Sequence, residues 1–369
     1  MPSASNYSFI DRALHRLAFS APAVQKILGE LESDFLGRRL AGVESRDEVF
    51  VTGLPRAGTT LLLDLLHGTG EFRAFTYRDM PFILAPVLWD RLSRSFRKRG
   101  TKIERAHGDG VAVSFDSPEA FEEVIWLAYL RTRYVQAETL APLAAGMLTE
   151  EFRSAIRTTV CKLLLNRDDS GTGSPSLRYL SKNNANISRI DAVADLFPTS
   201  KILIVFREPA AHVQSLVTQH RRFLQMHATD HFARQYMEWI GHYEFGANCK
   251  PIDFQGWLEG ETRPFRIDEA FWLRYWTAAY GSALKHRAQN VCFVDFDRLL
   301  ELPGPSLESL AGAVCLREKD RLVAAAASLR MPTTRPVGSG SFQRSEWNRA
   351  EAVHRQLQSL AIGPERPSL

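Results

Sequence analysis

The sequence predicts an α/β fold in which a small central parallel sheet is flanked by helices and extended by helical insertions. Residues 48–52 and 201–206 form short apolar runs, and the second is continuous, as in strands buried on both faces. Helical patterns follow these runs at residues 61–66 and 210–243. Because strands that alternate with helices usually pair in parallel, these segments predict both the sheet and its covering layers.

A glycine-rich turn separates the first predicted strand from its helix. It covers residues 53–60 and reads Gly-Leu-Pro-Arg-Ala-Gly-Thr-Thr. Backbone N–H groups at a helix N-terminus lack intrahelical partners, and the helix dipole favours an anion there. Arg56 adds a guanidinium, and Thr59 and Thr60 add hydroxyl donors. The turn therefore predicts a phosphate site; a tight turn whose glycines serve geometry alone is the alternative interpretation.

This turn differs from the loop that binds nucleoside triphosphates. Gly53, Gly58 and Thr60 fit the pattern G-x-x-x-x-G-K-[ST], but Thr59 stands in the lysine position. Kinases and ATPases need that lysine on the terminal phosphates. The sequence thus favours an anion other than a metal-bound triphosphate, and a P-loop phosphotransferase is the alternative enzyme.

The turn resembles the donor-binding loop of the sulfotransferase family, which has the form G-x-P-[RK]-[ST]-G-T-T. Ala57 departs from the usual Ser or Thr, so one hydroxyl is missing while the backbone N–H remains. The arginine form is similar to the bacterial and protein-tyrosine branches. The resemblance implies a P-loop-like three-layer fold and a turn that binds the phosphosulfate of 3′-phosphoadenosine 5′-phosphosulfate (PAPS). The matching residues are Gly53, Pro55, Arg56, Gly58, Thr59 and Thr60.

A second match follows the strand predicted at residues 201–206. Arg207 stands at the end of this strand, and Ser215 follows eight residues later on the next helix. By resemblance, both side chains bind the 3′-phosphate of PAPS. An arginine and a serine at these places can converge on one phosphate; a structural arginine and a helix-surface serine are the alternative.

A third match is a predicted strand at residues 177–182 that ends in a polar cluster. The resemblance places Lys182 near the bridging oxygen of the phosphosulfate, where its charge would stabilise the leaving phosphate together with Arg56. A solvated strand-end lysine is the alternative. Asn186 is expected to cap a helix over residues 187–197.

Sulfuryl transfer to a hydroxyl also requires a general base near the acceptor, and no metal is required. By resemblance to the tyrosyl and several glycan branches, the base is a glutamate beyond the donor loop; Asp79 stands at nearly that distance, with a shorter side chain than glutamate. His107 is the alternative, because it lies in a glycine-rich loop and the soluble branch uses a histidine. Lys182, Arg56 and one of these two bases would form the catalytic set.

Two later segments carry weaker signals. Residues 291–299 resemble the late strand of the family, and Asp297 is interpreted as structural rather than catalytic. Residues 331–342 are expected to form a loop, and the family often closes its donor site with a basic loop in this region. Arg335 and Arg344 are therefore weak candidates for the donor site.

The bulk composition suits a cytoplasmic enzyme. The chain has 369 residues and a net charge of +4, with no basic stripe of interleaved aromatics, so nucleic acid is not expected as a partner. Its four cysteines lack C-x-x-C spacing and are expected to be reduced, buried thiols. No segment reaches the roughly 18 apolar residues that span a bilayer.

We expect one domain over residues 1–369, with a donor-binding core at 46–315, an N-terminal helix at 7–20 and a C-terminal loop and helix at 331–361. The predicted activity is PAPS-dependent sulfation of a hydroxyl on a small molecule, a glycan or a lipid-linked acceptor, with carbohydrate or glycolipid favoured. A lipid-linked acceptor would bring peripheral membrane contact through the amphipathic N-terminal helix. A non-catalytic nucleotide-binding protein is the alternative that is not an enzyme. The sequence carries no signal of oligomeric state.

Overall fold

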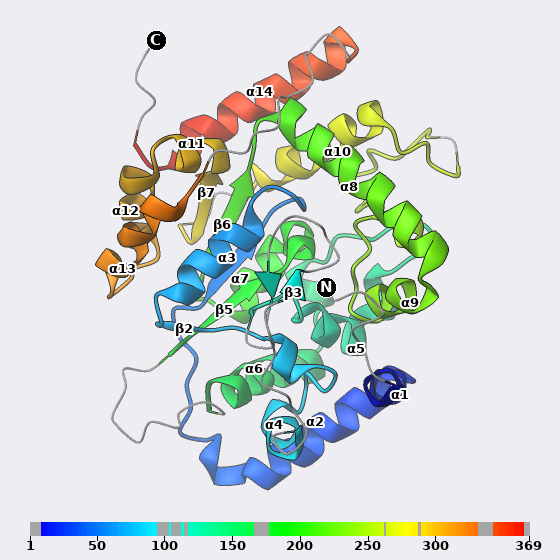
Figure 1. Cartoon of the computed structure of the whole chain (residues 1–369), viewed down its shortest axis with the longest axis vertical. Helices are drawn as coiled ribbons and strands as arrows, with labels where there is room; N and C mark the ends of the chain where they lie inside the picture. The colour runs from blue at the N-terminus through cyan, green and yellow to red at the C-terminus, as the bar shows by residue number, and fades with distance from the viewer. Residues whose placement is uncertain are drawn as a thin grey trace.

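The centre of the molecule is a six-stranded parallel sheet with the strand order β2-β5-β1-β6-β7-β8 (Figure 1). The computed structural model describes residues 9–93, 103–104, 112–113, 117–165, 177–261, 263–286, 289–330 and 342–364. The predicted α/β class and central parallel sheet are confirmed. The strands are β1 (Val49–Thr52), β2 (Phe72–Arg73), β5 (Arg178–Lys182), β6 (Lys201–Phe206), β7 (Val291–Asp295) and β8 (Ala361–Ile362), with a separate antiparallel pair, β3 (Ile103–Glu104) and β4 (Ala112–Val113).

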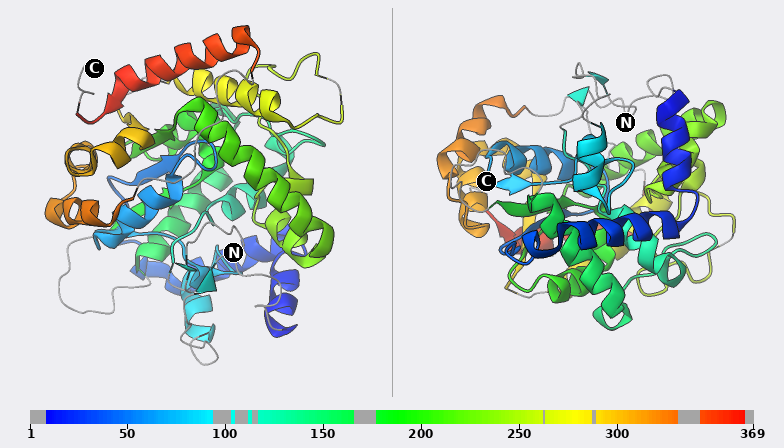
Figure 2. Two further views of the ribbon diagram at one scale, coloured as in Figure 1. Left: turned by 45° about the horizontal axis from the view of Figure 1, so that its top comes forward. Right: turned by 90° about the horizontal axis from the view of Figure 1, so that it is seen from below.

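Helices cover both faces of the sheet (Figures 1 and 2). In chain order the α-helices are α1 (Phe9–Ala18), α2 (Pro22–Leu36), α3 (Thr59–Gly68), α4 (Pro86–Ser93), α5 (Glu123–Tyr134), α6 (Glu150–Leu165), α7 (Ile190–Leu196), α8 (Pro209–Thr229), α9 (His231–Trp239), α10 (Glu269–Ala283), α11 (Phe296–Glu301), α12 (Pro303–Ala313), α13 (Lys319–Ala324) and α14 (Arg344–Leu360).

The alternation of side chains along the strands divides the interior into two cores. Val49 and Val51 of β1 pack with α3, α11, α12 and α13 on one face. Phe50, which lies between them, packs on the other face with α5, α6, α7, α8 and α10. Because both faces are covered, every residue of β1 is buried, which explains the three consecutive apolar residues at its start.

The helix predicted at residues 210–243 is two helices in the structure. Asp230 interrupts it at a φ of −122°, and its carboxylate accepts a hydrogen bond from the Ala233 N–H at 2.9 Å. This side chain caps α9, so the backbone can change direction between α8 and α9. The segment that follows α9 then returns toward the sheet and supplies part of the candidate site.

The prediction that Asn186 caps a helix over residues 187–197 is wrong. The carboxamide of Asn183 instead accepts from the Ala185 N–H at 3.0 Å and opens a 3-10 turn over Asn184–Ser188. The helix α7 begins only at Ile190. The chain therefore makes one tight turn directly after β5 before it becomes α-helical.

The two ends of the described chain pack against the body. The helix expected at residues 7–20 is α1, and the helix expected within 331–361 is α14, which runs along α10 (Figure 2). Most of the expected loop, residues 331–341, lies outside the described residues. The single-domain division and its core boundaries stay predictions. The four cysteines are unpaired, but the expectation of buried thiols is wrong, because Cys161, Cys249 and Cys292 are half-buried and Cys315 is exposed.

Two glycines allow the turn after β1 to lie close to its neighbours. Gly53 has a φ of 146°, and a Cβ added there would lie 2.4 Å from the Val205 carbonyl oxygen of β6. Gly58 has a φ of 101°, and an added Cβ would lie 2.1 Å from the Phe296 ring. Any larger residue would push the turn away from β6 and α11.

We predict that Gly53→Ala destabilises the protein by about 1–3 kcal/mol, because it combines a disfavoured φ with a clash against a backbone atom. Gly68→Ala, at the end of α3, is the matched control, since nothing lies within 4 Å of its added Cβ. The free energy of unfolding from urea titrations checks both variants. Equal stability of Gly53→Ala and the wild type would contradict the tight approach of the turn to β6.

Candidate active site

Four neighbouring strands end at the same edge of the sheet. β1 lies between β5 and β6, and β7 follows β6; Val51 pairs with Lys182 and Leu203, and Phe206 pairs with Asp295. The segments after these strands therefore meet. In open parallel sheets, ligands bind beyond the carboxyl ends of the strands, where the connections diverge.

The turn after β1 contacts the helix after β6. The Nε of Arg56 lies 3.4 Å from the hydroxyl of Ser215 on α8. Arg56 also has a φ of 71°, a conformation that is uncommon for a residue with a side chain and that occurs at functional sites. The two sequence motifs, residues 53–60 and 207–215, thus form one continuous site.

A buried histidine fixes this contact. His212 of α8 is fully buried, and its Nε2 lies 2.9 Å from the Pro55 carbonyl oxygen. The indole N–H of Trp276 donates to its Nδ1 at 3.1 Å, so Nε2 carries the proton and donates to Pro55. Burial lowers the pKa of His212 to about 3; Arg207 and Arg56 also lower it, while the hydrogen bond that the imidazole donates to the Pro55 carbonyl opposes them. The imidazole is therefore neutral.

Arg207 stands at the end of β6 beside Asp297. Its Nε lies 3.4 Å from Asp297 Oδ1, and Oδ2 of the same carboxylate accepts from the Glu208 N–H at 2.7 Å. Burial raises the pKa of Asp297, although the Glu208 N–H and Arg207 oppose this effect. Asp297 thus connects the end of β6 to the start of α8, and its interpretation as structural rather than catalytic stays a prediction; Asp295, not Asp297, caps α11.

Lys182, the last residue of β5, is buried with 6% of its surface exposed. Its Nζ lies 3.3 Å from Oε1 of Glu119, a residue with 4% exposure just before α5. Glu119 also accepts from the Ala120 N–H at 3.0 Å and from the Tyr77 hydroxyl at 3.2 Å. A buried cation and a buried anion therefore face each other at the edge of the sheet.

Two further glutamates next to Glu119 hold the turn after β5. Glu122 accepts from the Asn186 side chain at 3.2 Å, and Glu123 accepts from the Asn183 side chain at 2.7 Å. Glu123 also forms an ion pair with the buried Arg189. Since these carboxylates satisfy the polar groups of the turn, the residue before it, Lys182, is held in a defined place.

A pocket adjoins the turn after β1; we call it the loop pocket. Cationic, anionic, hydroxyl and aromatic groups share its surface. The lining residues are Pro55, Arg56, Thr59, Thr60, Glu119, Lys182, Asn184, Phe223, His242, Glu244 and Phe245.

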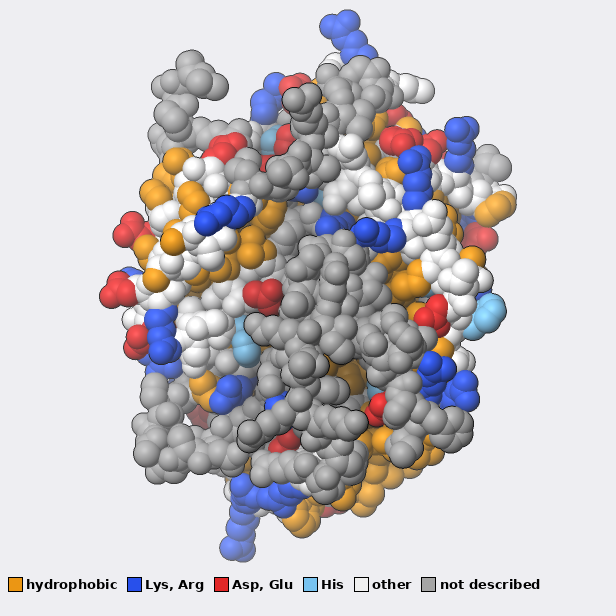
Figure 3. Space-filling view, in the orientation of Figure 1, with side chains coloured by type: hydrophobic (Ala, Val, Ile, Leu, Met, Phe, Trp, Pro, Cys, Tyr) orange, Lys and Arg blue, Asp and Glu red, His pale blue; other side chains and the backbone are white. Residues whose placement is uncertain are grey.

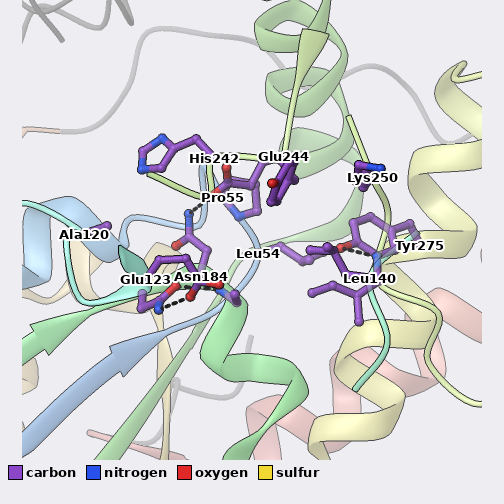
Figure 4. A pocket seen from close by; sticks show the side chains of 15 residues that line it. Leu54, Pro55, Ala120, Glu123, Leu140, Asn184, His242, Glu244, Lys250 and Tyr275 are labelled. Carbon is purple, nitrogen blue, oxygen red and sulfur yellow. Dashed lines mark hydrogen bonds between the residues drawn. The ribbon is translucent and has the colours of Figure 1, made fainter. Parts of the chain in front are cut away.

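A second, adjacent pocket shares Pro55, Asn184, His242 and Glu244 with the loop pocket (Figure 4). Asn184 connects the two: its Oδ1 accepts from the Thr59 hydroxyl, and its Nδ2 donates to Glu244, both at 3.2 Å. The buried Nε2 of His242 has no hydrogen-bond partner among the described residues. The junction of the two pockets is therefore polar and close to the start of α3.

A profile with the description "Sulfotransferase family" matches residues 48–255, which is more than half of the chain. The chain belongs to the sulfotransferase family. The resemblance found from the donor-loop residues is thereby confirmed, and the protein is an enzyme of this class. Members of the family generally take the sulfuryl group from PAPS.

The fold of this sulfotransferase is also similar to solved structures. Sulfotransferase STF9 from Mycobacterium avium aligns with a TM-score of 0.52 at 10% identity, over 96% of this chain and 85% of that chain. Sulfotransferase STF1 from Mycobacterium tuberculosis H37Rv aligns with a TM-score of 0.47 at 14% identity, over 95% and 86%. The likeness to STF9 supports the P-loop-like α/β fold. No curated protein matches the chain.

Two surface properties of the sulfotransferase bear on its partners. Within the described ranges, no helix has the length and apolar character that crossing a membrane demands. On the face shown in Figure 3, the described basic and acidic side chains are interspersed and do not separate into regions of one sign.

Most of the residues predicted for the donor site lie together. The turn after β1 contains Gly53, Ala57 and Gly58. The loop pocket is lined by Pro55, Arg56, Thr59, Thr60 and Lys182. Ser215 contacts Arg56, and Arg207 stands at the end of the neighbouring strand. Arg344 is an exposed residue at the start of α14. His107 and Arg335 lie outside the described residues.

Asp79 occupies a different environment. It is 1% exposed, and its Oδ2 accepts from the Thr76 N–H at 2.7 Å and from the Thr76 hydroxyl at 2.9 Å. These bonds form a capping box around the 3-10 turn Tyr77–Asp79. Asp79 is not among the described residues that line the loop pocket. Its role as the general base stays a prediction.

The sequence reasoning missed Glu119, Asn184, His242 and Glu244. Glu119 lies just before α5, and an acidic residue near the start of a helix is usually explained by the helix dipole, so its position carried no functional signal. His242 and Glu244 follow a helix break that the sequence did not indicate. Asn184 is the exception, because it belongs to the polar cluster after β5 that also contains the predicted site residue Lys182.

We predict that protonation of His212 destabilises the fold in mild acid. The pKa is about 3 in the folded state and near 6.5 in the unfolded chain, so only the unfolded state binds the proton between these values. The free energy of unfolding must therefore fall as the pH falls, by up to about 1.4 kcal/mol per pH unit for this group.

The measurement compares the wild type with His212→Gln, which cannot titrate but keeps a donor and an acceptor. The free energy of unfolding of the wild type minus that of His212→Gln should decrease by up to about 2 kcal/mol between pH 6.5 and pH 5. A constant advantage over this range would show that His212 does not bind the Pro55 carbonyl as a neutral group.

Proposed function

We propose that this sulfotransferase transfers the sulfuryl group of PAPS to a hydroxyl of a carbohydrate or glycolipid acceptor. The observation that carries the proposal is the contact between Arg56 and Ser215. It brings the motif expected to bind the 5′-phosphosulfate within reach of the motif expected to bind the 3′-phosphate.

The residues present fit such a donor. The turn after β1 offers backbone N–H groups at the start of α3, and its glycines leave room for a close approach of an anion. Arg56 and Lys182 add two cations on the same pocket, and Thr59 and Thr60 add hydroxyl donors. Arg207 is oriented by Asp297 at the neighbouring strand end.

The reaction is an in-line displacement at sulfur. The acceptor oxygen forms a bond to sulfur while the bond between sulfur and the bridging oxygen breaks, and the electron pair remains on the departing 5′-phosphate. Lys182 and Arg56 would stabilise the charge that grows on that oxygen. The acceptor proton passes to a general base, for which Asp79 and His107 stay the predictions from sequence. The absence of a metal requirement also stays a prediction.

The proposed acceptor class rests on the polar junction of the two pockets. His242, Glu244 and Asn184 offer hydrogen-bond donors and acceptors that suit a hydroxyl-rich molecule. Of the aromatic residues of α10, Phe271, Trp272 and Trp276 are at most 1% exposed and belong to the core, whereas Tyr275 lines the second pocket. A screen with labelled donor over glycan, small-molecule and lipid extracts would identify the acceptor.

We predict that adenosine 3′,5′-bisphosphate raises the Tm of the protein, because a ligand that binds only the folded state stabilises it. The shift should persist in EDTA and exceed that of ATP with Mg²⁺. Stabilisation by ATP with Mg²⁺ alone would favour the phosphotransferase. Tight binding of the bisphosphate without turnover of any hydroxyl acceptor would favour a non-catalytic nucleotide-binding protein.

Variants assign this binding to the two motifs. Arg207→Ala should weaken bisphosphate binding by about 10- to 100-fold, since a hydrogen bond to a charged group contributes about 1.5–3 kcal/mol. Ser215→Ala should weaken it less. Arg266→Ala, which removes a highly exposed arginine, is the control with the same change in net charge.

Asp79→Asn tests the predicted base. The prediction from sequence requires turnover to fall by about 100-fold or more in this variant while donor affinity stays unchanged. Retained turnover, with a loss of stability of about 1 kcal/mol in urea titrations, would contradict it and leave Asp79 with a role in the capping box alone.

A further inference from the structure

We propose that donor binding separates the ion pair between Lys182 and Glu119, and that the released Glu119 carboxylate acts as the general base. The inference rests on the proposed function, because it requires a phosphorylated donor in the loop pocket. It assigns a catalytic role to a residue that the sequence did not single out, and it makes activation of the acceptor depend on a bound donor.

The geometry places the two groups on the surface of the loop pocket, together with Arg56, Thr59 and Thr60. Lys182 Nζ and Glu119 Oε1 are 3.3 Å apart, and the two residues are 6% and 4% exposed. A carboxylate in this position lies among the groups expected to bind an anion. Two anions in a poorly hydrated pocket repel each other, so the donor and Glu119 compete for the same ammonium group.

The contacts of the pair indicate which partner moves. The Glu119 carboxylate accepts hydrogen bonds from the Ala120 N–H at 3.0 Å and from the Tyr77 hydroxyl at 3.2 Å. The Ala120 donor is a backbone group of the residue that follows Glu119. Lys182 carries its charge on a flexible four-carbon chain. We therefore expect the ammonium group to turn toward the 5′-phosphate while the carboxylate stays in place.

After this exchange both groups have a role in the displacement. The acceptor hydroxyl transfers its proton to Glu119 as its oxygen bonds to sulfur. The bond between sulfur and the bridging oxygen breaks, and the electron pair remains on the 5′-phosphate beside Lys182. The products are the sulfate ester, adenosine 3′,5′-bisphosphate and a protonated Glu119, which returns its proton to solvent. Without donor, the carboxylate is paired with Lys182 and is a weaker base.

Two other carboxylates are less suited to this role. Glu244 also lines the loop pocket, but its contact is with the neutral side chain of Asn184, so donor binding would not release it. Asp79 accepts two hydrogen bonds from Thr76 in a capping box. Glu119 is thus the carboxylate of the loop pocket whose described contacts include the lysine that the donor would attract.

The test measures donor affinity and turnover separately in Glu119→Gln. Removal of the competing charge should lower the Kd of adenosine 3′,5′-bisphosphate by about fivefold in calorimetry. Removal of the base should lower kcat by at least about 100-fold. Glu151→Gln is the matched control, because it removes one negative charge from an exposed ion pair on α6 and should change neither value.

Each deviation has a distinct meaning. An unchanged or higher Kd for Glu119→Gln would overturn the competition between Glu119 and the donor. A lower Kd with kcat within about tenfold of the wild type would overturn the base and leave Glu119 only as a partner of Lys182. If the wild type does not bind the bisphosphate at all, the proposed function fails first.

Two further measurements do not depend on the folding of Glu119→Gln. Glu119→Asp keeps the charge but shortens the side chain by one carbon, so it should turn over more slowly than the wild type with less gain in affinity than Glu119→Gln. A crystal structure of the wild type with the bisphosphate should place Lys182 Nζ beyond ion-pair distance of Glu119. Retention of the 3.3 Å contact in that complex would overturn the proposal.

Discussion

The site depends on the contact between the turn after β1 and the helix α8. His212 makes this contact from a fully buried position, as a neutral donor to the Pro55 carbonyl, and Trp276 fixes its tautomer. A charged imidazole could not be accommodated there, because burial and two nearby arginines oppose the proton. Arg56 and Ser215 meet only because α8 is held against the turn in this way. Because β1 and β6 pair in parallel, the turn after β1 and the helix after β6 start beside each other.

Two of the cations at the strand ends, Arg207 and Lys182, each have a carboxylate partner. A pocket for a multiply charged anion needs buried positive groups, and buried positive groups are costly without partners. Asp297 accompanies Arg207, and Glu119 accompanies Lys182. Each cation is thereby stabilised before any ligand is present. Under the proposal that the donor competes for Lys182, donor affinity depends on the Glu119 carboxylate.

The segment that follows α9 gives the loop pocket two polar groups. His242 and Glu244 come from a turn that the break at Asp230 makes accessible, and Asn184 connects Glu244 to the first residue of α3. Two regions far apart in the chain thus share hydrogen bonds at the start of the donor helix. A change in the turn after β1 would therefore alter this junction through the hydrogen bond between Thr59 and Asn184.

Local patterns in the sequence determined the sheet, the turn after β1 and the strand-end residues Arg207 and Lys182. These features depend on apolar runs, glycine conformations and fixed spacings, which act over a few residues and can be recognised without tertiary information. The family followed from the same residues. The capping roles of Asn183 and Asp230, and the half-buried or exposed cysteines, were not evident, because helix ends and surface exposure depend on packing partners from elsewhere in the chain.

Only the tertiary structure decided which groups meet in the pocket. Glu119 lies 63 residues before Lys182, and Glu244 lies 60 residues after Asn184, so no local spacing relates them. Asp79 occupies the place in the chain that resembles a base, yet its hydrogen bonds to Thr76 are those of a cap. An acidic side chain has the same chemistry wherever it occurs in a sequence. Its function depends on which buried cation, donor or ligand the fold places within a few ångströms of it, and that is a property of the packed chain.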